Sequence, residues 1–79
     1  MEIKMLYPDA RWISEAEVVA WGHDRMLDAA VAAVAARAGR PLSDTEIADA
    51  AETVATPTFQ EALGVLEDEG VATFSTEVR

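Results

Sequence analysis

The stretch that decides the fold is residues 42–74, LSDTEIADAAETVATPTFQEALGVLEDEGVATF. In this stretch Ser43 precedes Glu46 by three residues, which is the spacing of a capping box: each side chain accepts a hydrogen bond from the backbone amide of the other residue. The apolar residues Leu42 and Ile47 flank the box as a hydrophobic staple. We therefore expect a short helix from Asp44 to Thr53.

A third helix and a strand are expected in the rest of this stretch. Thr56 is a capping residue, and Pro57 suits the first helical position, where a missing N–H costs nothing. Gly70 is expected to end this helix. Residues 71–78 are rich in β-branched and aromatic side chains, which favours a strand.

The N-terminal half predicts another strand and a long first helix. Residues 2–7 (EIKMLY) alternate roughly between polar and apolar, as a short strand does, and Pro8-Asp9 ends it. Ser14 with Glu17 forms another capping box, and the helix is expected to run to Ala38, where Gly39 provides a left-handed stop. The two terminal strands are expected to pair as a two-stranded sheet.

The long helix is apolar on two faces. The first face carries Ala16, Ala20, His23, Leu27, Ala30, Val31, Val34 and Ala38. The second face carries Val18, Trp21, Ala29, Ala32 and Ala36. A helix with two apolar faces must be buried on both of them. Either it kinks at Gly22, or its second face is the interface of a homodimer, which is the arrangement we predict. For Trp12, just before the helix, core packing is expected.

Residues 42–74 resemble the winged-helix family of helix-turn-helix domains. The resemblance rests on the Ile47-Ala48 pair in the second helix and on the sequence LEDEGV at residues 66–71. It covers 33 of the 79 residues and implies a winged-helix-like fold, mostly α-helical with a minimal β-sheet. The length of the chain predicts that residues 1–79 form a single domain. Only one strand follows the third helix here, so the wing is expected to be truncated. In this family the third helix enters the DNA major groove.

The charge distribution opposes DNA binding by the third helix. Residues 1–40 carry six acidic and five basic side chains, a net charge of −1. Residues 41–79 carry nine acidic side chains and one basic side chain, a net charge of −8. A DNA-binding protein needs cations to neutralise phosphates, and the third helix has none.

The candidate functional residues follow from this conflict. The outward positions of the third helix, expected to contact a partner, are Thr58, Gln60, Glu61, Gly64, Val65 and Asp68, with Glu67 beside them. The second helix adds an acidic face of Glu46, Asp49 and Glu52. If DNA is bound, the phosphate contacts are expected from Arg37, Arg40 and Arg79. Gly64 is notable because a mid-helix glycine costs about 1 kcal/mol relative to alanine; close approach of another backbone and simple tolerance remain equal explanations.

Catalytic, metal and cofactor sites are not expected. His23 is the only histidine and there is no cysteine, so it has no partner of its kind for a metal site. Ser14 and Ser43 are explained as helix caps. The longest apolar run, residues 29–36, is far short of the ~20 residues that span a bilayer. We expect a cytoplasmic, non-enzymatic protein without a small-molecule substrate or membrane contact.

Three functions remain in competition. The first is a regulatory module in transcription control that binds a basic surface of a protein partner through its acidic helices. The second is a dimeric winged-helix regulator that binds DNA. The third is a salt-adapted domain whose acidity serves solvation alone.

Overall fold

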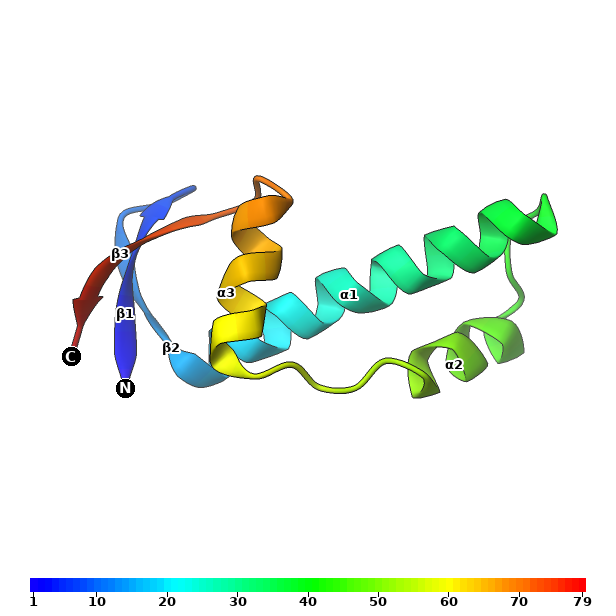
Figure 1. Cartoon of the computed structure of the whole chain (residues 1–79), viewed down its shortest axis with the longest axis horizontal. Coiled ribbons are helices and arrows are strands. Elements are labelled where there is room, and N and C mark those ends of the chain that lie inside the picture. Colours follow the sequence, from blue (N-terminus) through cyan, green and yellow to red (C-terminus); the bar gives the residue numbers. More distant parts are fainter.

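A computed structural model describes all 79 residues and shows three helices beside a small antiparallel sheet (Figure 1). The elements in chain order are β1 (Glu2–Tyr7), β2 (Arg11–Ser14), α1 (Glu15–Ala38), α2 (Asp44–Glu52), α3 (Phe59–Asp68) and β3 (Thr73–Val78). The expected class, mainly helical with a small sheet that joins the two ends of the chain, is confirmed. The expectation of two strands is wrong, because the sheet has three strands in the order β2-β1-β3.

The additional strand, β2, forms a hairpin with β1. Ile3 lies opposite Ile13, and Lys4 lies opposite Trp12, so the apolar pair faces the helices while the other pair faces outward. β3 pairs antiparallel with β1 on its other side, as expected. The sequence signal for β2 was present but short: its four residues end at the serine that caps the next helix.

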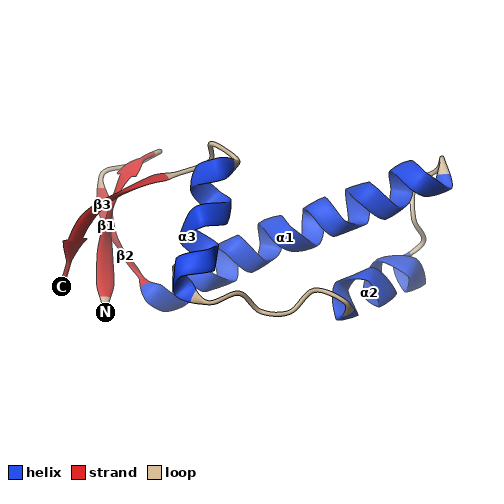
Figure 2. Cartoon of the chain, in the orientation of Figure 1, coloured by secondary structure: helices blue, strands red, loops and turns tan.

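The hydrophobic core lies between the sheet and the crossing of α1 with α3 (Figure 2). It consists of Ile3, Met5, Ile13, Val18, Ala62, Leu63, Leu66 and Ala72. Every strand-derived member comes from β1 or β2, and the staple residues Ile13 and Val18 both belong to this cluster. The core therefore occupies one end of the molecule.

The contact between Gly22 and Ala62 sets how closely α1 and α3 approach. Helix α1 runs from Glu15 to Ala38 without interruption, and Gly22 is buried within it. A Cβ atom at Gly22 would lie 2.6 Å from the Cβ and 2.9 Å from the Cα of Ala62. The expected alternative of a kink at Gly22 is replaced by a close helix crossing, for which a residue without a side chain is required.

The two faces of α1 are covered by different elements at its two ends. Helix α3 packs on the first half of α1, and α2 packs on the second half (Figure 1). Residues 53–58, which we call the connector, link them without helix or strand, and α2 has no substantial packing against α3. The packing of second helix on third that defines a helix-turn-helix is therefore not observed.

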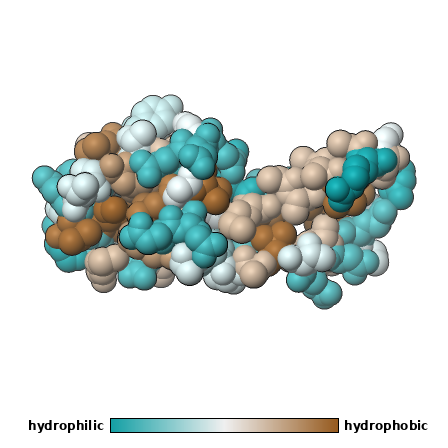
Figure 3. Space-filling model, in the orientation of Figure 1, coloured by the Kyte–Doolittle hydropathy of each residue, from teal (hydrophilic) through white to brown (hydrophobic).

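The molecule is consequently elongated. Its principal extents are 43 × 20 × 16 Å and its radius of gyration is 14.4 Å, whereas a compact domain of this length has about 12 Å. Figure 3 shows a larger lobe, which contains the sheet and α3, joined to a smaller lobe made by the end of α1 and α2. Only Ala50 is buried in the smaller lobe, and it retains 9% of its exposure.

The helix caps confirm most of the expected boundaries. The Ser43 and Glu46 capping box is complete, and Gly39 has the left-handed φ of 69°. Ser14 caps α1, although the carboxylate of Glu17 accepts from the Ser14 hydroxyl rather than from its backbone amide. The expected start of the third helix at Thr56 is wrong by two residues, because Thr58 forms a complete capping box with Glu61 and leaves Pro57 buried in the connector.

Candidate protein-binding surface

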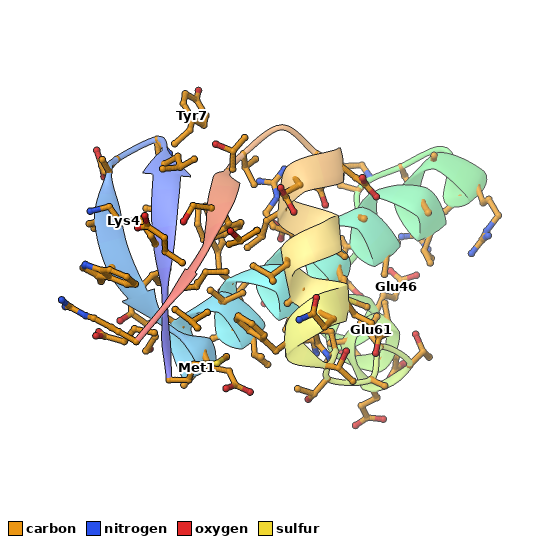
Figure 4. The ribbon with its side chains drawn as sticks, turned by 60° about the vertical axis from the view of Figure 1, so that its left-hand side comes forward. Met1, Lys4, Tyr7, Glu46 and Glu61 are labelled. Carbon is orange, nitrogen blue, oxygen red and sulfur yellow. The ribbon has the colours of Figure 1, made fainter.

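The net charge lies entirely in the helical part of the chain. The sheet regions, residues 1–14 and 73–79, contain three acidic and three basic side chains and are neutral. Residues 15–72 contain twelve acidic and three basic side chains, a net charge of −9. Figure 4 shows Glu46 and Glu61 on the helices, on the opposite side of the molecule from Lys4 on the sheet.

Internal ion pairs occupy four of the five arginines. Each of these arginines contacts one glutamate: Arg11 with Glu17, Arg25 with Glu69, Arg40 with Glu46, and Arg79 with Glu2. Four carboxylates are thus neutralised within the chain, and the other eleven of the fifteen have no ion-pair partner. Nine of these eleven carboxylates lie in residues 15–72, so the helical part keeps a strong negative charge.

The outward positions of α3 divide into structural and free groups. Thr58 and Glu61 cap the helix: the Glu61 amide donates to Thr58 Oγ1 at 3.2 Å, and the Thr58 amide donates to Glu61 Oε1 at 3.3 Å. Gln60 and Asp68 are exposed, as is Glu67. Of the remaining candidates, Val65 and Gly64 are half-buried, and a Cβ at Gly64 would meet nothing within 4 Å.

The three acidic residues expected on the second helix also have different roles. Asp49 and Glu52 are exposed and unpaired. Glu46 is engaged: Arg40 donates from Nη1 and Nη2 to its two oxygens at 2.8 and 2.9 Å, and the Ser43 amide donates at 3.0 Å. The hydrogen bond from Arg40, followed by those from Ser43, lowers the pKa of Glu46 to about 2.

The low pKa of Glu46 predicts how the stability depends on pH. A carboxyl group whose pKa is lower in the folded state contributes stability above its unfolded value of 4.5, and this contribution is lost as the pH falls through about 2. Glu46→Gln keeps a side-chain oxygen for the cap but removes the charge. We expect a lower urea midpoint for the variant near neutral pH, and a difference from the parent that closes between pH 4.5 and about 2. A constant difference over this range would contradict the assignment.

The three arginines expected to contact DNA phosphates do not gather on one face. Arg37 and Arg40 lie at the far end of α1, whereas Arg79 lies at the end of β3 beside the sheet (Figure 1). Arg40 and Arg79 are moreover held by Glu46 and Glu2. The arrangement offers no basic stripe next to α3.

The residues expected at a dimer interface are also separated. Val18 is fully buried in the chain's own core, and this part of the prediction is wrong because α3 and the sheet already cover that position. Trp21 is half-buried and packs against the same core. Ala29, Ala32 and Ala36 are exposed on the second half of α1, and a dimer through them stays a prediction.

Sequence reasoning missed a cation–aromatic stack on the outer face of the sheet. The guanidinium carbon of Arg79 lies 4.4 Å from the ring centroid of Trp12, and Lys4 Nζ lies 5.5 Å from it. Trp12 is thus half-buried on the outer face, not in the core as expected. The signal that would have revealed it is the alternation of Trp12 and Ile13 after the Pro8-Asp9 turn, which is typical of a hairpin.

His23 positions the connector. Its Nε2 lies 3.4 Å from the carbonyl oxygen of Val54, and its ring is half-buried between α1 and the connector. No group of three or more histidine, cysteine or acidic side chains is arranged to hold a metal ion. None of the helices combines the length and the apolar character that crossing a membrane requires.

Comparison with known proteins assigns no family. No protein-family model matches the sequence, and no curated protein and no solved structure matches it either.

Proposed function

We propose that this chain is a non-enzymatic binding module that captures a basic protein surface with the acidic outer faces of α2 and α3. The observation that carries the proposal is the separation of charge: the helical part has a net charge of −9 and the sheet is neutral. The exposed carboxylates Asp49, Glu52, Glu67 and Asp68 belong to none of the four ion pairs of the chain.

The negative charge density of the chain indicates which kind of partner it attracts. Nine net negative charges along an axis of 43 Å amount to about one charge per 5 Å, compared with about one per 1.7 Å in duplex DNA. A basic surface that otherwise binds nucleic acid is attracted by such a field, and the association rate is raised by electrostatic steering. A role in transcription control is supported only by the sequence resemblance of residues 42–74, so the partner is proposed by its charge.

Charge reversal on α3 tests the proposal. Glu67→Lys with Asp68→Lys places cations at a helix C-terminus, which favours folding, and it spares the capping residues Thr58 and Glu61. The matched control, Asp9→Lys with Glu77→Lys, makes the same change of charge at exposed positions of the sheet region. The protein is immobilised, and bound proteins from a lysate of its source organism are quantified by isotope labelling.

The two double variants are expected to behave differently. The α3 variant should capture at least about tenfold less basic protein than the parent chain. Electrostatic steering raises association rates by about 10- to 1,000-fold, and the variant loses this attraction. The sheet variant should retain nearly all of it. Equal losses would show that only net charge matters, as expected for a salt-adapted domain, and unchanged capture by both would refute the proposed surface.

A further inference from the structure

An apolar groove lies along the first half of α1, on the part of its first apolar face that α2 does not reach. Its volume is about 710 Å³, and its lining includes Met1, Glu15, Ala16, Val19, Ala20 and His23. Four of its eight lining residues are apolar, and the other four are Ser14, Glu15, His23 and Thr56. Volume and lining are in the range of sites that bind ligands or peptide side chains.

The groove is the uncovered end of a continuous apolar face. Ala16, Ala20 and His23 share this face with Leu27 and Val34, farther along α1. α2 packs on the second half of α1, but at 1.5 Å per residue its nine residues cover only about 14 Å of a helix about 36 Å long. After α2 the connector passes His23 in the first half of α1, and no helix packs on this face at Ala16 and Ala20.

The uncovered length of α1 suits a helix as the element that packs on it. A helix laid along Ala16 and Ala20 would continue the layer that α2 begins, and the small alanine side chains let it approach closely. Met1 and Thr56 of the connector also line the groove, which is open to solvent.

The charge of the helical part of the chain favours a basic helix over an acidic one. Glu15 lines the groove and has no ion-pair partner, and residues 15–72 have a net charge of −9. A second copy of the chain would bring the same negative charge against it, which like-charge repulsion opposes. A helix with lysine or arginine beside its aliphatic row meets complementary charge.

We propose that this groove binds the aliphatic face of an amphipathic, positively charged helix of a partner protein. The inference rests on the proposed function, whose partner it specifies. The acidic faces of α2 and α3 attract the partner, and the groove supplies the apolar contact that makes the complex persist.

The test uses the full chain and two synthetic peptides of about 18 residues, long enough for appreciable helicity. One peptide has leucine on one helical face and lysine on the other, and the second has glutamate in place of lysine. Ala16→Gln fills the groove with a polar side chain at an exposed position. Ala33→Gln is the matched control, at an exposed position of the same helix outside the groove. Binding is measured by fluorescence anisotropy.

We expect the leucine–lysine peptide to bind and the leucine–glutamate peptide not to bind. Ala16→Gln should raise the Kd by about tenfold or more, and Ala33→Gln should leave it nearly unchanged. If Glu67→Lys/Asp68→Lys weakens binding while Ala16→Gln does not, the groove proposal is overturned and the proposed function survives. Absence of peptide binding, or a dimer that Ala16→Gln dissociates in light scattering, also overturns it.

Discussion

Gly22→Ala is expected to lower the free energy of unfolding by about 1–3 kcal/mol, the usual cost of inserting an extra carbon into a packed interior. The new Cβ atom would lie 2.6 Å from Ala62 Cβ and 2.9 Å from Ala62 Cα, so α1 and α3 must move apart. This cost opposes the gain of about 1 kcal/mol in helix propensity. At roughly 4–8 °C per kcal/mol for a domain of this size, the Tm should fall by several degrees or more.

Two further variants separate the close contact from general effects of glycine. Gly64→Ala, where the Cβ meets nothing within 4 Å, should instead stabilise the chain by up to about 1 kcal/mol. Ala62→Gly removes the atom nearest to the new Cβ at position 22, so Gly22→Ala/Ala62→Gly should be less destabilised than the sum of the two single variants. A stabilising effect of Gly22→Ala would disprove the close crossing.

Leu66→Ala is expected to cost about 2–5 kcal/mol, because a large-to-small change in a core leaves a cavity. Leu66 is fully buried, and its carbonyl oxygen also accepts the amides of Val71 and Ala72, which lead the chain from α3 into β3. Ile47→Ala removes a similar amount of apolar side chain from the smaller lobe. Since Ile47 is 39% exposed, that change should cost less than about 1 kcal/mol.

Comparing Leu66→Ala with Ile47→Ala tests whether stability is concentrated in the larger lobe. Urea denaturation gives the two free energies of unfolding, and amide hydrogen exchange shows whether α2 opens before α3 and the sheet. We expect low protection in α2, since a nine-residue helix is marginal without tertiary packing and only Ala50 is buried there. Equal losses for the two variants, or equal protection of α2 and α3, would show a single cooperative core.

The candidate site was only partly predictable from the sequence. The acidic residues could be placed on the outer faces of α2 and α3 from helical periodicity alone. Their division into engaged and free carboxylates could not: Glu46 is held by Arg40, and Glu69 by Arg25 from another helix. An ion pair between distant elements depends on how these elements pack, which a charge count does not contain.

The sequence by itself determined the local structure. The caps at Ser14 and Ser43 and the left-handed stops at Gly39 and Gly70 lie where the sequence predicts them, because these signals act within three or four residues along the chain. Thr58 rather than Thr56 caps α3 for the same local reason, because only Thr58 has a glutamate three residues ahead to complete the capping box.

The tertiary structure decided which element covers which part of α1. An apolar helix face indicates that another element must bury it, but it does not identify that element. Here α3 crosses α1 at Gly22, α2 lies on the far half, and the face at Ala16 and Ala20 is left open. That outcome depends on side-chain fit between residues some 40 positions apart. It gives an elongated acidic molecule with an open groove in place of the expected helix-turn-helix packing.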